Sequence, residues 1–173
     1  MADFKTKYPA TSSVALTITL ASLASSSTRL VGRESTAVDN TTNLDLDHLL
    51  SGRIRVGSST LTANKAIEVW VYAPVRMVTG TPTYPDVFDG TDSDETIAND
   101  GQKGSALALA ATIYPATTIS LDYYVKPTSI AALFGGVMPP FWGIFVTHDT
   151  AVALDSTGSN HYFEYERIQN QSV

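Results

Sequence analysis

The chain contains no cysteine. A disulfide framework is therefore excluded, and so is any chemistry that needs a thiolate as a nucleophile or as a metal ligand. Charged side chains are also scarce, at 16% of 173 residues, whereas about a quarter is usual in globular proteins. Threonine, serine, alanine and valine are abundant instead. This composition favours β structure that is stabilised by packing and assembly.

The sequence also lacks a cluster of Lys and Arg and an apolar run long enough to span a membrane. The formal net charge of −6 argues against nucleic acid as a main partner. Two lysines precede the run VALTITLASL, as in a signal peptide, but threonines alternate with its apolar residues. This alternation is typical of a strand. We therefore expect no nucleic-acid partner, no membrane partner and no cofactor.

No Pro-rich or Ser/Gly-rich linker divides the chain, and its length is sufficient for one hydrophobic core. We predict an N-terminal arm over residues 1–13 and a single β-sandwich domain over residues 14–173. The arm contains Lys5, Lys7 and Tyr8 but few hydrophobic anchors. We expect it to become ordered on a neighbouring subunit.

Alternation of apolar and polar residues predicts about six strands. The clearest covers residues 66–73 and ends at Pro74, which has no backbone N–H to donate. A helix is an alternative for residues 46–50 and for residues 105–114. A short helix is predicted near residues 128–135, with Thr128 or Ser129 as its N-cap. The other predicted strands cover residues 14–20, 44–56, 105–114, 117–126, which Pro127 ends, and the two arms of 139–168.

Residues 139–168 carry six of the sixteen aromatic side chains. The pattern predicts two strands around a long polar turn, forming a hairpin. We place the first strand inside a sheet, because both of its faces are apolar, and the second nearer an edge or solvent.

Many short strands with long irregular connections predict an all-β fold. We expect an antiparallel two-sheet sandwich, either a jelly roll or a related Greek key, with at most one short helix. An immunoglobulin-type sandwich is the second choice, because its Cys-Trp-Cys anchor is missing.

Residues 79–104 are predicted to form a long loop, since Pro, Gly and Asp are frequent and apolar periodicity is weak. Residues 86–100, the acidic segment, hold six acidic side chains and no Lys or Arg. Asp89, Asp92, Asp94 and Glu95 offer the oxygen ligands that Ca²⁺ prefers. Their spacing does not match an EF-hand loop, however. We favour a solvated or partner-facing acidic loop over a calcium site.

Other candidates for chemistry are His148 and His161, which flank the polar turn of residues 148–161. Together with Asp149 or Asp155 they could hold a divalent metal, but hydrogen bonding to the backbone is the more common role. No serine lies in a G-x-S-x-G motif. We expect no enzymatic activity.

Aromatic side chains could also form sugar-binding platforms. Most of them alternate with aliphatic residues, so core or interface packing is the favoured interpretation. The rings considered are Trp70, Tyr72, Tyr84, Tyr123, Tyr124 and Trp142.

Five segments resemble a family of uncharacterised virion structural proteins of tailed bacteriophages. They are GRESTAVDN (residues 32–40), KAIEVWVYA (65–73), PTYPDVFDGTDS (82–93), SIAALFGGVMP (129–139) and WGIFVTHDTAVALDSTGSNH (142–161). The resemblance implies a virion protein, made in the host cytoplasm, that serves as a jelly-roll decoration or cement protein on the outer surface of the head. Its partners would be the major capsid protein or other virion proteins, and further copies of itself in a homo-oligomer such as a trimer.

A tail-associated or head-fibre component, and a carbohydrate-binding module for host adsorption, remain alternatives. The expected partner contacts are Lys5, Lys7, Tyr8, Asp86, Asp92, Asp94, His148, Asp149, Asp155 and His161.

Overall fold

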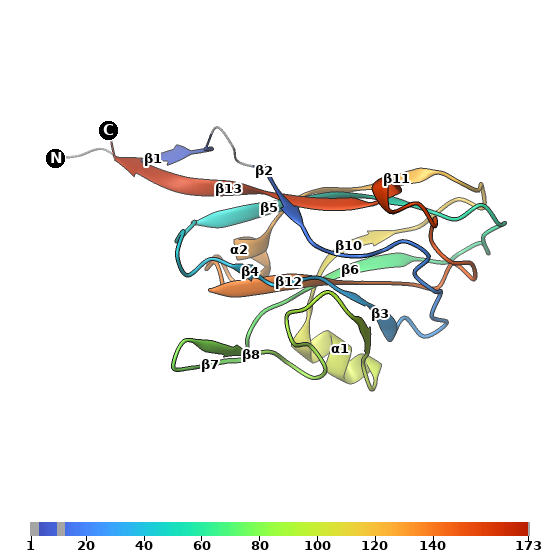
Figure 1. Cartoon of the computed structure of the whole chain (residues 1–173), viewed down its shortest axis with the longest axis horizontal. Coiled ribbons are helices and arrows are strands. Elements are labelled where there is room, and N and C mark those ends of the chain that lie inside the picture. Colours follow the sequence, from blue (N-terminus) through green and yellow to red (C-terminus); the bar gives the residue numbers. More distant parts are fainter. Residues whose placement is uncertain (1–3, 10–12, 173) are drawn as a thin grey trace.

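In the computed structural model, which describes residues 4–9 and 13–172, two antiparallel sheets pack face to face (Figure 1). The first sheet has the order β1-β13-β5-β11, and β2 also pairs with β13. The second has the order β10-β6-β12-β3-β9, and β4 also pairs with β12. The strands are β1 (Phe4–Lys7), β2 (Ser13–Leu16), β3 (Val31–Glu34), β4 (Val38–Asp39), β5 (Asp47–Arg55), β6 (Ile67–Tyr72), β7 (Arg76–Val78), β8 (Thr81–Thr83), β9 (Asp94–Thr96), β10 (Ala108–Ile113), β11 (Asp122–Ser129), β12 (Phe141–His148) and β13 (Tyr162–Ser172); the helices are α1 (Asp100–Ala106) and α2 (Ile130–Leu133), with a 3₁₀ turn at Gly158–Asn160.

The strand order is that of a jelly roll. When β1, β9 and the β7–β8 hairpin are set aside, and β3 and β4 are counted as one interrupted strand, the sheets read β2-β13-β5-β11 and β3/β4-β12-β6-β10. Such interleaving of two four-stranded sheets through Greek-key connections defines the jelly roll. The predicted fold class is therefore confirmed.

The main core lies between the two sheets. In β5 the residues alternate strictly, so that His48, Leu50, Gly52 and Ile54 are buried while the residues that alternate with them are partly exposed. In β12, by contrast, almost every residue is buried. The reason is that the segment between β6 and β10 covers the outer face of the second sheet, where Phe88, Ile97 and Leu107 pack around Tyr72 and Phe145. Both faces of β12 are therefore apolar.

Residues 139–168 do not form the predicted hairpin. Strand β12 lies in the second sheet, between β6 and β3, whereas β13 lies in the first sheet, between β5 and β2. The position of the first strand inside a sheet is confirmed, but the second strand lies in the interior of its sheet and not at an edge. Alternation reports which faces are buried and does not reveal which strands pair, so the crossing between sheets could not be read from it.

Other elements differ from prediction at their ends. Strand β11 passes through Pro127, because a bulge between Val125 and Thr128 releases the proline from the ladder. The long predicted loop contains β8, β9 and the additional helix α1, which Asn99 caps by accepting from the Gln102 N–H. Helix α2 is confirmed, with Ser129 as its N-cap. Gly135 and Gly136 follow it with positive φ, as a helix end requires.

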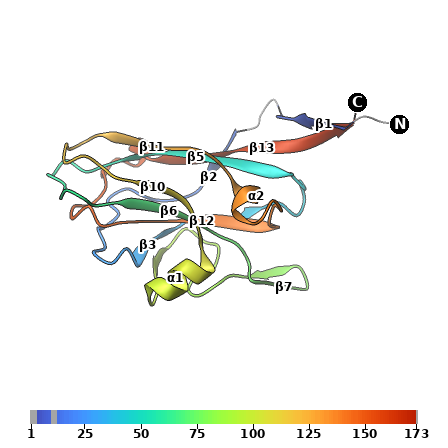
Figure 2. The ribbon, with the colours of Figure 1, turned by 180° about the vertical axis from the view of Figure 1, so that it is seen from behind.

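The predicted N-terminal arm includes β1, whereas its residues 1–3 and 10–12 are outside the described part. Strand β1 pairs with residues 169–172 of its own chain. This two-stranded terminal ribbon extends past the rest of the first sheet, at the end where both termini lie (Figures 1 and 2). No helix in the described part is long and apolar enough to cross a membrane.

Candidate functional site

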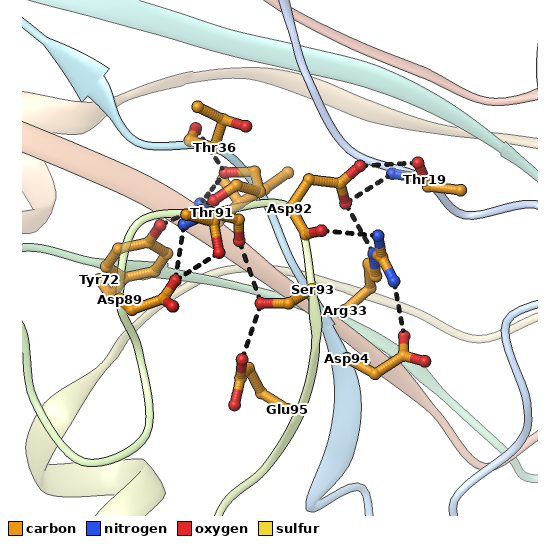
Figure 3. A network of polar contacts seen from close by, with 12 residues as sticks. Thr19, Arg33, Thr36, Tyr72, Asp89, Thr91, Asp92, Ser93, Asp94 and Glu95 are labelled. Carbon is orange, nitrogen blue, oxygen red and sulfur yellow. Dashed lines mark hydrogen bonds and ion pairs between the residues drawn. The ribbon is translucent and has the colours of Figure 1, made fainter.

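The acidic segment is bound to the body of the protein through Asp92 (Figure 3). Its carboxylate accepts hydrogen bonds from Arg33 Nε at 2.6 Å, from the Thr19 N–H at 3.0 Å and from Thr19 Oγ1 at 2.6 Å. Burial works to raise the pKa of Asp92, but the bonds from Arg33 and Thr19 outweigh it and hold the pKa below its usual value. Asp94 pairs with the same guanidinium at 3.1 Å. Arg33 thus forms ion pairs with two of the proposed calcium ligands, Asp92 and Asp94.

The other two proposed calcium ligands make local bonds. Asp89 accepts from the Thr91 N–H and hydroxyl, at 2.9 and 2.6 Å, and Glu95 accepts from Ser93 Oγ at 2.8 Å. Figure 3 shows these carboxylates directed to separate partners. In residues 4–9 and 13–172, no three or more His, Cys, Asp or Glu side chains are grouped so that they could hold a metal ion. The four proposed calcium ligands are therefore bound by donors of the protein, some within the acidic segment and some outside it.

A buried carboxylate on β3 also holds this segment. Glu34 is fully buried and accepts from the Gly90 N–H at 2.7 Å and from the Asp89 N–H at 3.3 Å. Burial raises the pKa of Glu34 to about 6, although the hydrogen bonds from the two backbone N–H groups oppose the shift. Glu34 thus fixes the loop at the cost of an unfavourable buried charge near neutral pH.

The candidate histidines have separate structural roles, His148 at the end of β12 and His161 between the 3₁₀ turn and β13. His148 is fully buried, with Nε2 3.0 Å from the Leu23 carbonyl and Nδ1 2.9 Å from Thr150 Oγ1. His161 bonds to the Asp155 carbonyl at 2.9 Å and to the Arg55 N–H at 3.3 Å. The backbone-bonding interpretation is confirmed, and the structure does not bring the two imidazoles together at a metal site.

Burial also corrects part of the predicted contact surface. His148, Asp149 and His161 are all buried, so their prediction as partner contacts is wrong. Asp149 instead pairs with Arg29 and Lys65. Asp155 is partly buried and accepts from the Thr157 N–H and from Asn160 Nδ2, and Asp92 is engaged as described above. The predicted contacts that remain exposed are Lys5, Lys7, Tyr8, Asp86 and Asp94.

Of the six rings considered as sugar platforms, two are buried and three are partly buried. Trp142 is fully buried, and Tyr72 packs beside Gly143 and donates its hydroxyl to the Ser35 carbonyl at 2.8 Å. Tyr124 is the exception, with 62% of its surface exposed.

A pocket that the sequence analysis missed lies at one end of the sandwich. It has a volume of about 540 Å³, and exposed Leu44, Leu46 and Val137 contribute to its rim. Leu44 has a φ of +51°, a left-handed conformation that is unfavourable for a bulky residue, and its side chain is 74% exposed. The full lining is Asn40, Thr41, Leu44, Asp45, Leu46, Gly136, Val137, Met138 and Pro140. We name it the end pocket.

Asp45, which lines the end pocket, belongs to a buried polar network. Asp45 accepts from His48 Nε2 at 3.0 Å, from Arg167 Nε at 2.8 Å and from Gln169 Nε2 at 2.6 Å. The other ring nitrogen of His48 accepts from Trp142 Nε1 at 2.9 Å, so His48 is neutral with its hydrogen on Nε2. Burial lowers the pKa of His48. Since both ring nitrogens are engaged, this Asp–His pair joins the two sheets and has no free position for proton transfer.

The β7–β8 hairpin exposes apolar side chains on a projection. Its two strands pair only with each other, through Arg76–Val78 and Thr81–Thr83. Val75, Met77 and Val78 are 67%, 38% and 44% exposed. Both views show the hairpin extending away from the two sheets (Figures 1 and 2).

Comparisons of the chain with protein-family models, with curated proteins and with solved structures found no match. The resemblance to phage virion proteins therefore stays a prediction from the sequence.

Proposed function

We propose that this protein is a non-enzymatic structural protein of a bacteriophage virion, which decorates the outer surface of the head and binds the major capsid protein. The observation that carries the proposal is the β7–β8 hairpin, which presents Val75, Met77 and Val78 to solvent. The segments that resemble phage virion proteins, and the jelly-roll fold, support the same assignment. Because a fold alone does not define a function, the test must address the hairpin and the virion directly.

The physical reason lies in the energetics of the hairpin. An isolated two-stranded hairpin is marginally stable in water, and apolar side chains on a projection gain free energy when a partner covers them. Burial of one such side chain contributes about 1.5–3 kcal/mol. A hairpin of this kind is therefore suited to insertion between subunits of a larger shell.

Replacement of Val75, Met77 and Val78 together by serine is expected to weaken binding to isolated phage heads by at least about tenfold, which corresponds to about 1.4 kcal/mol. The melting temperature should change little, since the hairpin strands pair only with each other. Binding is measured by co-sedimentation of the purified protein with heads from which the native protein has been stripped.

The matched control is replacement of Thr79, Thr81 and Thr83 by serine, which changes the same hairpin without removing its apolar side chains. Wild-type binding by the Val75/Met77/Val78 variant would exclude the hairpin as the contact. A density map of the virion that places the protein only on the tail would contradict the head assignment and support the tail alternative.

A second candidate function, glycan binding, is favoured by one row of side chains on the outer face of the first sheet. Tyr124 and Tyr162 are the cross-strand neighbours of Arg53 on either side. They are 62% and 42% exposed, and the Arg53 guanidinium lies 5.3 Å from the centre of the Tyr162 ring. Exposed rings with polar neighbours can stack on the apolar face of a sugar.

Replacement of Tyr124 by alanine is expected to abolish retardation of the protein on immobilised host-cell glycans, if this row binds sugar, because the more exposed of the two rings in the row is lost. Affinity electrophoresis measures the retardation, and Tyr114→Ala, which removes a ring that is 74% exposed and lies outside the row, is the control. Equal migration of wild type with and without glycan would exclude this function.

A further inference from the structure

The terminal ribbon has an unoccupied strand edge. Strand β1 has β13 on one side, and the described residues provide no strand on its other side. Lys5, Thr6 and Lys7 are all exposed. Since β5 pairs with β13 only as far as Ile168, the ribbon consists of two strands without a third. Such a ribbon is a template for addition of another strand.

A second unoccupied edge lies on the other sheet. Strand β9 ends the order β10-β6-β12-β3-β9, and among the described residues no strand follows it. Its Asp94 and Thr96 are exposed. The two edges are similarly short, with four residues in β1 and three in β9.

The two edges carry opposite charge. The described parts of the terminal ribbon, residues 4–9 and 169–172, contain Lys5 and Lys7 and no acidic residue. Strand β9 belongs to the acidic segment, which contains six acidic residues and no basic one; Arg33 of β3 pairs with Asp92 and Asp94, and the segment keeps a net negative charge. Residues two apart in a strand face the same side, so both lysines share one face of β1. Opposite charges on directly paired strands stabilise the pair, and like charges destabilise it.

One copy of the chain does not bring these edges together. In both views β1 lies at the end of the molecule that holds the termini, whereas β3, the partner of β9, lies toward the other end (Figures 1 and 2). A basic edge and an acidic edge at opposite ends make a surface that is complementary to a second copy of itself.

We infer that the β1 edge of one copy adds to the β9 edge of a second copy, with Lys5 and Lys7 facing the acidic segment. The contact is heterologous, because it joins different surfaces of the two copies, and repetition therefore gives a closed ring or an open chain. The inference does not depend on the virion role, and it assigns the terminal ribbon to self-assembly and not to the capsid contact.

The test reverses the charges on each edge. In sedimentation velocity at low salt, the wild-type chain is expected to form oligomers. The variants Lys5→Glu/Lys7→Glu and Asp94→Lys/Thr96→Lys are each expected to associate at least about tenfold more weakly. The variant with all four substitutions is expected to regain association, because its β1 edge is acidic and its β9 edge is basic.

Controls separate edge pairing from net charge and from misfolding. Arg76→Glu/Lys126→Glu changes the net charge as much as the Lys5/Lys7 variant does, on other elements, and should associate like the wild type. High salt, where the Debye length falls to about 3 Å, should weaken wild-type association. Circular dichroism melts check that each variant is folded.

A monomeric wild type at low salt would overturn the inference, and so would unchanged association of the Lys5/Lys7 variant or no recovery in the four-substitution variant. None of these results would decide whether the protein binds heads.

Discussion

Replacement of Asp45 by alanine is expected to lower the free energy of unfolding by about 3–5 kcal/mol, the range found when one partner of a buried ion pair is removed. The side chain of Asp45 is 1% exposed and accepts from Arg167, Gln169 and His48. Without it, the partly buried guanidinium and the His48 N–H lose their acceptor. The effect extends to both sheets, because His48 on β5 also accepts from Trp142 on β12.

Urea unfolding of the variant and the wild type at neutral pH measures this loss. Asp45→Asn separates the charge from the shape, since the amide keeps one acceptor oxygen but presents an N–H₂ to donors; we expect it to be destabilised as well. Glu166→Ala, at an exposed position of β13, is the control and should stay within about 0.5 kcal/mol of the wild type. A loss below about 1 kcal/mol for Asp45→Ala would show that the network contributes little.

Much of the fold could be predicted because its signals are local. Alternation in 66–73 and 44–56 gives strands β6 and β5, and Ser129 with Gly135 and Gly136 gives helix α2 and its end. The low charge and short strands give the two-sheet class. Each of these inferences needs only residues that are near one another in sequence.

The pairing of strands and the candidate site depend on distant residues. The acidic neighbours of Asp92 favour a solvated or partner-facing loop, whereas its partner Arg33 is 59 positions away in the sequence. The sequence does not reveal the role of His48. Asp45 is near it in sequence, but its other partner, Trp142, is 94 positions away. The end pocket depends on Leu44 in a left-handed conformation, where the alternation of Leu44 and Leu46 had predicted a strand. The preceding turn-forming residues Asn40 and Asn43 were the available signal for that turn.

The three buried histidines are expected to make the protein lose stability as the pH falls from about 7 to about 5. Burial lowers the pKa of His48, His148 and His161 below the usual value of 6.5. Near pH 6.5 and below, these three histidines therefore bind more protons in the unfolded chain than in the folded chain. Their contribution to stability is complete above about pH 6.5 and is lost below it, by up to about 1.4 kcal/mol per pH unit for each histidine.

Glu34 acts in the opposite direction over part of this range. Burial raises its pKa from the usual value of 4.5 to about 6, so between these values the folded chain binds the extra proton and stability increases as the pH falls. The maximum gain is about 2 kcal/mol, since one pKa unit corresponds to about 1.4 kcal/mol. The histidine and Glu34 contributions to the free energy of unfolding therefore oppose each other over part of this range. Chemical denaturation at several pH values should show a steeper fall of the free energy of unfolding in Glu34→Gln than in the wild type below about pH 6, and a shallower fall in His161→Gln. An unchanged slope in His161→Gln would mean that this imidazole accepts a proton without opening the fold, and an unchanged slope in Glu34→Gln would mean that Glu34 is ionised in the folded chain throughout.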